Sequence, residues 1–268
     1  MYMGNEEWQE NGTTIEQVEL DAILFAHQEW LQTSAKAGKR ADLRGADLSR
    51  RNLQQANLER ALLTGVTLEG ANLRTANLRG ANLKSANLQR ANLQWAILVE
   101  ADLREANLSE ASLHFSNLTK ADLSNALLQC AFLHNAYFAE ANLRAANLTG
   151  ANLRFTEFHS ADMRQALMKG ATLPETKLVG ANLREAILSD AEIIRSDFER
   201  ADLKRTYICR ANIRKSKFSF ADLSWSTLKE SRIEKGDFRY ASLRELNLEG
   251  VYFLDNDLQG ADLQGSLL

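Results

Sequence analysis

Residues 41–60 read ADLRGADLSRRNLQQANLER, which is four consecutive blocks of five residues built on one pattern. From Ala41 onward, the third residue of every block is Leu, Ile, Met or Phe, without a slip, as far as Leu268. Leu fills 34 of these 46 third positions, the first position is Ala in 31 blocks, and the second is usually Asn or Asp. A repeat this regular decides the fold before any helix or strand is assigned.

The period of five fits neither an α-helix, with about 3.6 residues per turn, nor a flat strand, with its period of two. Each block must therefore contain a bend. Positions one and three can both point inward, as on an extended segment, while positions two, four and five face solvent. Ten of the fourteen Gly residues occupy position five, which predicts a turn with a positive φ angle there. We expect each block to form one side of a coil.

These blocks resemble the pentapeptide-repeat family, whose pattern is a small residue, Asn or Asp, Leu or Phe, and two variable residues. The resemblance covers residues 41–268. It implies an all-β solenoid, a right-handed quadrilateral β-helix with four blocks per coil and about 11 coils behind an N-terminal α-helical cap. Residues 36–48, KAGKRADLRGADL, are similar to the junction between helix and repeats in bacterial members, which are especially numerous in cyanobacteria.

The sequence offers its own test of a coil of twenty residues, because similar core side chains should then stack at that spacing. Two columns at position three have this spacing: Phe138, Phe158, Phe198, Phe218 and Phe238, and also Ile193, Ile213 and Ile233. Of the six core Phe residues, only Phe253 lies outside the first column. We therefore predict stacked coils that are stabilised by apolar contacts between neighbours.

The first 40 residues lack the repeat and are expected to form a tail and a helical cap, followed by the β-helix domain over residues 41–268. An uncovered first coil would expose apolar side chains and unpaired strand groups. Residues 14–34 have helical spacing, and Thr13 with Glu16 fits a capping box. The residues of the apolar stripe are Ile15, Val18, Ala22, Phe25, Ala26, Trp30 and Leu31. A membrane helix or a partner-binding helix is the alternative.

Charge and cysteine content exclude several classes of protein. The repeats hold 28 acidic against 29 basic residues, which argues against a strongly basic nucleic-acid binder and equally against an acidic mimic of DNA. Cys130 and Cys209 are too few for a disulfide scaffold and do not fit a zinc site. The start lacks the features of a signal peptide, and no apolar run approaches the roughly 18 residues of a membrane helix. We expect a cytoplasmic protein that contacts neither nucleic acid nor a membrane.

Candidate residues for catalysis or metal binding are few. His114 and His134 share position four in adjacent coils, but no third ligand of good quality joins them. Asp at position two stands beside Arg or Lys at position four, as in Asp42 and Arg44 or Asp202 and Lys204, which predicts weak surface ion pairs. No phosphate-binding loop or nucleophile motif is present. We expect no catalytic residue, no metal and no cofactor.

Outward positions between residues 95 and 155 break the polar pattern on two adjoining faces. Trp95 and Phe115 share position five in consecutive coils and should stack. A contiguous exposed apolar patch is more often a partner surface than a chance cluster of apolar residues. The alternative is an aromatic ladder that only stiffens the coil. The predicted partner-binding residues are Trp95, Ile97, Val99, His114, Phe115, Phe132, His134, Tyr137 and Phe155.

The leading functional hypothesis is a non-enzymatic scaffold that presents rigid, flat faces to a protein partner of unknown identity. The alternative comes from the family resemblance, since some relatives bind DNA gyrase as DNA-like rods and protect it from inhibitors or toxins. Those relatives typically combine a negative surface with dimerisation through the C-terminus. The neutral rod of this chain weakens the analogy, and fold alone does not transfer function.

The repeats run to the final residue, so Leu258, Leu263 and Leu268 are expected on an incompletely covered coil. Exposed strand edges and apolar core ends attract another chain. The sequence therefore predicts end-to-end association through the C-terminal end, as a twofold homodimer. A monomer in which the last coil frays, or is covered by Phe253 and Leu254, is the alternative.

Overall fold

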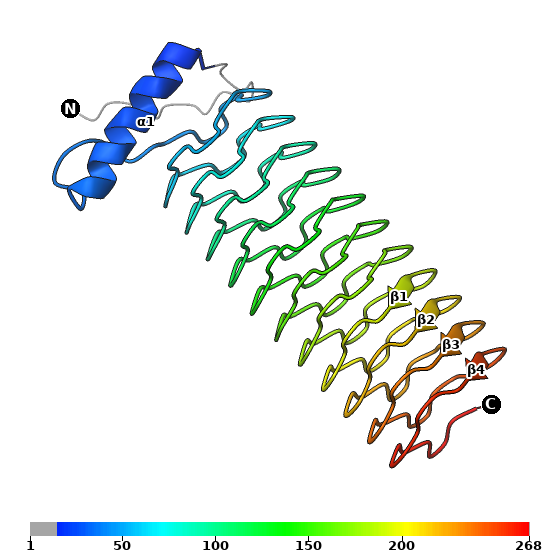
Figure 1. Ribbon diagram of the computed structural model, residues 1–268. Coiled ribbons are helices and arrows are strands. Elements are labelled where there is room, and N and C mark those ends of the chain that lie inside the picture. The colour runs from blue at the N-terminus through cyan, green and yellow to red at the C-terminus, as the bar shows by residue number, and fades with distance from the viewer. Residues whose placement is uncertain (1–14, 268) are drawn as a thin grey trace, which may run out of the picture.

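The structure, a computed structural model, describes residues 15–267, which form one helix followed by a long β-solenoid. Helix α1 (Gln17–Gln32) lies at the N-terminal end of the rod, and the coils follow one another as stacked layers to the C-terminus (Figure 1). Parallel backbone pairs join residues twenty positions apart along the rod, from Asp42 with Leu62 to Asn247 with Leu267. The predicted coil of twenty residues is confirmed. We number the four sides of a coil from the blocks that begin at residues 41, 46, 51 and 56.

Regular strands occur on the third side of the last coils. They are β1 (Glu192–Ile194), β2 (Asn212–Arg214), β3 (Arg232–Glu234) and β4 (Tyr252–Leu254), which form one parallel sheet in that order. Elsewhere between residues 41 and 267, each side contributes a single bridging residue at position two, followed by a turn. A side of five residues that ends in a turn leaves room for a strand of three residues at most.

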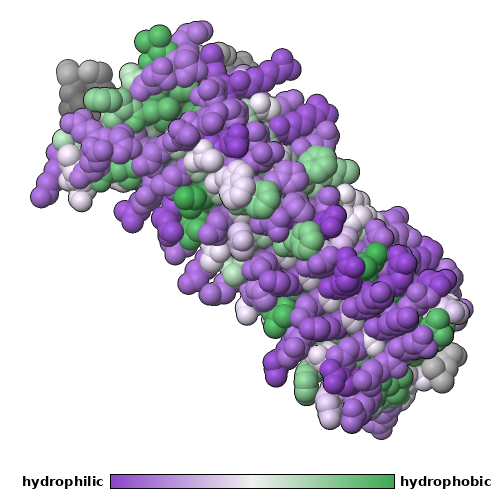
Figure 2. Space-filling model, viewed as in Figure 1, coloured by the Kyte–Doolittle hydropathy of each residue, from purple (hydrophilic) through white to green (hydrophobic). Residues whose placement is uncertain are grey.

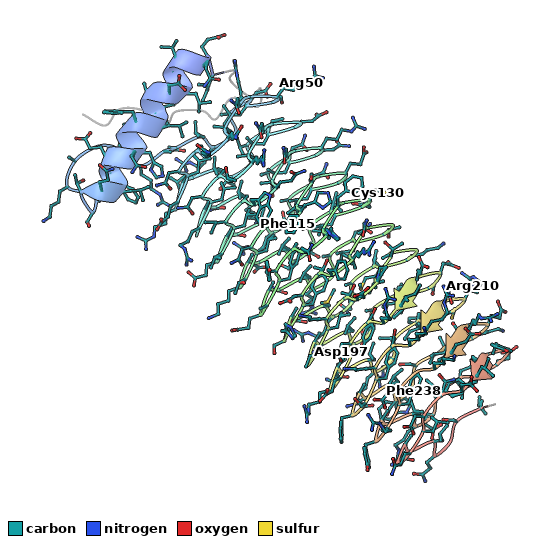
Figure 3. All side chains as sticks on the ribbon, viewed as in Figure 1. Arg50, Phe115, Cys130, Asp197, Arg210 and Phe238 are labelled. Atoms are coloured by element: carbon teal, nitrogen blue, oxygen red, sulfur yellow. The ribbon has the colours of Figure 1, made fainter. Side chains whose placement is uncertain are left out.

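The turns hold position five in the left-handed region of backbone space, as the Gly pattern predicts. Gly65 has a φ angle of 66°, and non-Gly residues adopt nearly the same value, for example Trp95 at 62° and Phe115 at 60°. Up to the last coil, a hydrogen bond to the next coil holds the turn; for example, the N–H of Trp95 donates to the carbonyl of His114 at 3.0 Å. Residues at position five therefore stand at the corners of the rod. Arg50, Cys130 and Arg210, which share one corner, mark this edge in Figure 3.

The core is a continuous stack of side chains from positions one and three. In the Phe column, the ring centroids of Phe198 and Phe218 lie 4.8 Å apart, and those of Phe218 and Phe238 lie 4.9 Å apart. Phe138 and Phe158 stack in the same way at 5.0 Å. The column is confirmed, but the prediction that Phe253 belongs to the core is wrong. Phe253 is 38% exposed and packs at the end of the column, 5.7 Å from Phe238.

Helix α1 covers the first coil with a different face from the predicted one. Leu20 and His27 are buried, and Ile23 and Leu24 pack against the core of the rod. These residues follow the i, i+3, i+4, i+7 spacing of one helix face. The predicted stripe is wrong for three of its residues because the helix is rotated about its axis, and these three are solvent-exposed: Val18, Ala22 and Phe25.

Hydrogen bonds fasten the cap to the rod. Arg51 donates to the carbonyl of Ile15 at 2.8 Å, and the backbone N–H of Ala41 donates to Nδ1 of His27 at 3.1 Å. The predicted capping box is not formed, because Glu16 is itself the N-cap of α1 and makes no side-chain cap hydrogen bond. Thr13 lies outside the described residues. Within residues 15–267, no helix has both the length and the apolar character needed to cross a membrane.

Candidate partner-binding surface

Four rings from the third side form a continuous aromatic ladder, which we define as Trp95, Phe115, His134 and Phe155. The indole of Trp95 and the ring of Phe115 stack face to face, with centroids 4.2 Å apart and planes within 6°. His134 meets Phe115 edge-on at 5.9 Å and Phe155 edge-on at 5.3 Å. Trp95 is 50% exposed, and the other three rings are half-buried. The predicted stacking of Trp95 on Phe115 is confirmed.

His114 and Phe132 extend the ladder sideways across the third side. The His114 ring lies 6.0 Å from that of His134 and 6.0 Å from that of Phe132. Ile97 and Tyr137 are exposed on the adjoining fourth side, in the column that bridges through residue 117. The structure thus brings His114 into contact with the ladder and Phe132 into contact with His114, and it places Ile97 and Tyr137 on the adjoining side. Phe115 is labelled on the middle coils in Figure 3.

Val99 does not belong to the exposed surface, so its prediction as an outward residue is wrong. Only 8% of Val99 is exposed. Ser219 and Ser224, which also occupy position four, are buried as well. Side chains at position four have neighbours about 4.8 Å above and below them, so a short side chain is covered by the adjacent coils.

Most of the face drawn in Figure 2 is hydrophilic, with single hydrophobic residues scattered along the rod.

The two histidines of the surface are close together, but they do not form part of a larger ligand cluster. Burial lowers the pKa of His114, and the neighbouring His134 ring acts in the same direction. His114 is therefore neutral near pH 7 and carries one N–H donor. Throughout the described part of the chain, no group of three or more His, Cys, Asp or Glu residues lies close enough to hold a metal ion.

The charged residues of the first side form ion pairs, as predicted. Arg104 binds Asp102 at 2.6 Å, and this contact holds the pKa of the Asp102 carboxyl below its usual range. The pairs of Arg44 with Asp42 and Arg164 with Asp162 are alike. Lys204 is an exception, because it reaches Asp222 of the next coil at 2.7 Å rather than Asp202. Such exposed pairs contribute little to stability.

One feature of the candidate surface was missed by reasoning from the sequence. The guanidinium of Arg154 lies over the ring of Phe155, 4.8 Å from its centroid. Positions four and five of one block are neighbours at every corner, so the repeat register itself is the signal that could have found this pair. Arg154 adds a cation to the end of the aromatic ladder.

The comparisons with known proteins agree with the architecture. No curated protein sequence matches the chain. Among solved structures, HetL, a pentapeptide repeat protein involved in heterocyst differentiation regulation from the cyanobacterium Nostoc sp. strain PCC 7120, is 31% identical, with a TM-score of 0.67. The match covers 90% of this chain and 96% of HetL.

Two further structures are more distant. A trypsin-treated variant of QnrB1, a plasmid-mediated fluoroquinolone resistance protein, is 17% identical over 79% of this chain and 86% of its own, with a TM-score of 0.35. The Nostoc protein alr5209, a pentapeptide repeat protein, is 24% identical over 52% of this chain and 84% of its own, with a TM-score of 0.32.

The sequence profile described as Pentapeptide repeats matches the chain in eight segments. They are residues 41–80, 86–125, 116–154, 131–170, 151–190, 166–205, 191–230 and 237–268. These segments span nearly all of the rod, whose bridges repeat every twenty residues. The chain therefore belongs to the pentapeptide-repeat family, and its rod is a right-handed quadrilateral β-helix.

Proposed function

We propose that this chain is a non-enzymatic scaffold that binds a protein partner through the aromatic ladder and the neighbouring side chains of Ile97, Phe132 and Tyr137. The observation that carries the proposal is the ladder itself, in which four rings stay in contact across consecutive coils while Trp95 remains half exposed. Aromatic residues that cluster at a surface supply most of the energy in many protein interfaces.

The rod holds these rings in place before any partner arrives. Each position-five residue is fixed by a backbone hydrogen bond to the next coil, as in Phe115, whose N–H donates to the carbonyl of His134 at 3.1 Å. Ring-to-ring contacts restrict the side chains further. Binding to a preorganised surface loses less conformational entropy than binding to a flexible loop. The geometry therefore favours recognition of a partner with a complementary face.

A role in regulation is consistent with the similarity to HetL. HetL is a pentapeptide repeat protein involved in heterocyst differentiation regulation, and its similarity covers 90% of this chain. A regulatory protein can act by binding alone. We therefore infer that this chain regulates its partner through occupancy of the aromatic surface rather than through a reaction.

A second pair of stacked rings provides a matched control for the experiment. Phe220 and Tyr240 also occupy position five in consecutive coils, stack at 5.2 Å with planes within 12°, and are exposed. They lie at another corner, near the C-terminal end. If stacked rings served only to stiffen the rod, both pairs would behave alike. A difference between the pairs in partner binding therefore separates recognition from stiffening.

The test is quantitative affinity capture from an extract of the source cells with three proteins: wild type, Trp95→Ala with Phe115→Ala, and Phe220→Ala with Tyr240→Ala. We expect a partner retained by wild type and by the second double variant but lost by the first. Thermal unfolding should show similar, small losses of stability for both variants. Capture that is the same for all three proteins, or lost equally by both variants, would contradict the proposal.

A further inference from the structure

The third side of the rod contains no acidic residue over six consecutive coils. Its blocks at residues 51–55, 71–75, 91–95, 111–115, 131–135 and 151–155 hold Arg, His, Asn, Gln and aromatic residues, but no Asp or Glu. Parallel bridges from Asn52 to Asn152 show that these blocks are stacked on one another. The rod as a whole has 28 acidic and 29 basic residues, so this local imbalance is hidden in the total.

Two cations of this acid-free side, Arg74 and Arg154, lack the carboxylate partners that most cations of the first side have, whereas Arg51, next to the cap, lies 3.9 Å from the carboxylate of Glu16. Arg104 and Arg164 bind Asp at 2.6 Å and 2.5 Å. In contrast, Arg74 and Arg154 are exposed, and neither has an Asp or Glu at ion-pair distance within residues 15–267. Arg154 instead covers the ring of Phe155. Two arginines, one on each side of the histidines, are therefore available to an external carboxylate.

Two acidic residues on the flanks of the third side already have cationic partners. Glu110, at the corner that leads into it, is held by Arg90 at 2.9 Å. Glu157, on the fourth side, is held by Lys177 at 2.7 Å. Neither carboxylate neutralises Arg74 or Arg154. The surface that contains the aromatic ladder therefore carries a net positive charge from Arg74 and Arg154.

The rings of the ladder favour a ligand rich in hydrogen-bond acceptors. Trp95 and Phe115 cover each other face to face, and the rings of Phe115 and His134 meet edge to face at 86°. Ring edges carry the positive part of the aromatic quadrupole and attract oxygen atoms. Bases of single-stranded nucleic acid stack on ring faces, and the stacked pair leaves few faces free. A carboxylate-bearing peptide therefore suits this surface better than a nucleic acid does.

We propose that the partner's contacting segment is an acidic peptide chain that lies along the third side, with carboxylates on Arg74 and Arg154 and apolar side chains on the aromatic ladder. This inference rests on the proposed function, because it specifies the chemistry of the partner at the same surface. Four coils separate Arg74 from Arg154, which at about 4.8 Å per coil is roughly 19 Å, the length of about six extended residues.

The test measures fluorescence anisotropy of a labelled, extended peptide of about ten residues, in which two Glu residues stand about six positions apart, matching the spacing of the two arginines, and Phe occupies alternate positions between them, so that Glu and Phe share one face. The comparison probes are the same peptide with Lys in place of Glu and a single-stranded oligothymidylate. We expect the acidic peptide to bind, and to bind more weakly as the NaCl concentration rises. Arg74→Gln with Arg154→Gln should weaken its binding at least about tenfold, since each removes a charge-assisted contact.

The first side offers matched control residues for this double variant. Arg144 is exposed and, within residues 15–267, has no carboxylate at ion-pair distance, as for Arg74. Arg205 lies 6.0 Å from the ring centroid of Trp225, as Arg154 lies over Phe155. Arg144→Gln with Arg205→Gln changes the net charge by the same amount on another side of the rod. We expect this control to bind the acidic peptide within about twofold of wild type.

Several outcomes would overturn the inference. It fails if the Lys peptide or the oligothymidylate binds more tightly than the acidic peptide, or if the two Arg double variants weaken binding equally. Capture of the native partner distinguishes it from the proposed function. If Trp95→Ala with Phe115→Ala abolishes capture but Arg74→Gln with Arg154→Gln does not, the surface is still a docking site, and the proposal that the partner's segment is acidic is wrong. If neither variant changes capture, the proposed function fails.

Discussion

Asn256 occupies the space that Gly236 leaves in the preceding coil. The N–H of Gly236 donates to Oδ1 of Asn256 at 2.7 Å, and Nδ2 of Asn256 donates to the carbonyl of Ile233 at 2.9 Å. A Cβ atom at position 236 would lie 3.0 Å from that Oδ1 and 2.6 Å from Cε2 of Phe238. Position one is normally a small residue, so the larger Asn256 is accommodated because its neighbour has no side chain.

Gly236→Ala should therefore destabilise the C-terminal coils by about 1–3 kcal/mol, the usual cost of overpacking a tight core. Asn256→Ala should cost about 1–2 kcal/mol through the loss of its two hydrogen bonds. The double variant should cost less than the sum, because removal of Oδ1 relieves one of the two close contacts. Urea denaturation of the four proteins measures this. Strictly additive effects would show that the two positions do not interact.

Phe218 and Phe220 both stack on a ring of the next coil, but Phe218 does so inside the core and Phe220 does so on the outer surface of the rod. Phe218 is 1% exposed in the core column, and Phe220 is 51% exposed at a corner. We expect Phe218→Ala to cost about 3–5 kcal/mol, because it leaves a cavity between two rings, and Phe220→Ala to cost less than about 1 kcal/mol. The midpoints of urea denaturation of the two variants and wild type measure these losses. Equal losses would mean that outward stacking stabilises the rod as much as core packing.

The sequence was sufficient to predict the coil of twenty residues, the Phe198–Phe218–Phe238 column and the stacking of Trp95 on Phe115. All three follow from the repeat register, which is a one-dimensional property. The register was not sufficient for Val99, because its exposure depends on coverage by the coils above and below. Lys204 shows the same limit, since a long cation can reach a carboxylate in its own coil or in the next one.

The orientation of α1 could not be predicted for a different reason. Apolar residues occur around much of the helix, so periodicity favoured Val18 and Phe25 as strongly as Leu20 and Leu24. The contacts that select the buried face are with the rod, such as the hydrogen bond from Ala41 to His27. These depend on tertiary structure at the junction. The acid-free third side is different, because it follows from the sequence once blocks twenty residues apart are stacked.

Balanced charge predicts the behaviour of this chain toward DNA gyrase. Mimicry of DNA requires a surface of negative potential, and the repeats hold 28 acidic against 29 basic residues. We expect neither inhibition of gyrase supercoiling nor protection against gyrase poisons at protein concentrations stoichiometric with the enzyme. Supercoiling assays over a range of salt concentrations test this. Stoichiometric binding that weakens as salt rises would support gyrase regulation instead.

The apolar surface of the last coils predicts concentration-dependent self-association. A cavity of about 280 Å³ there is lined by Leu and Phe side chains that include Phe253 and Leu263, both partly exposed. Strand β4 is the edge of its sheet among the described strands, and such edges pair readily. Sedimentation velocity should show a larger species as the concentration of wild type rises, but not with Leu263→Glu. A monomer at every concentration would remove this prediction; Leu268 lies outside the described residues.

The junction between cap and rod should weaken in acid because of His27. This side chain is fully buried; Nδ1 accepts the hydrogen bond from Ala41, and within the described residues Nε2 has no hydrogen-bond partner. Burial lowers the pKa of His27 from its ordinary value of 6.5; Arg40 acts in the same direction and Glu59 partly opposes it. The native state thus binds a proton less readily than the unfolded state does. The contribution of His27 to stability is complete above pH 6.5 and is lost as the pH falls below that value.

Amide hydrogen exchange gives a local measurement of this effect. After correction for intrinsic rates, amides of α1 should exchange faster at about pH 5.5 than at about pH 7.5 in wild type, while those of the central coils change less. His27→Asn should remove most of this pH dependence, because its Oδ1 can still accept from Ala41 and does not titrate in this range. His159→Asn, on the rod surface, is the control and should behave as wild type does. If α1 of the His27→Asn protein kept the full pH dependence, another group would be responsible for the acid sensitivity of the cap.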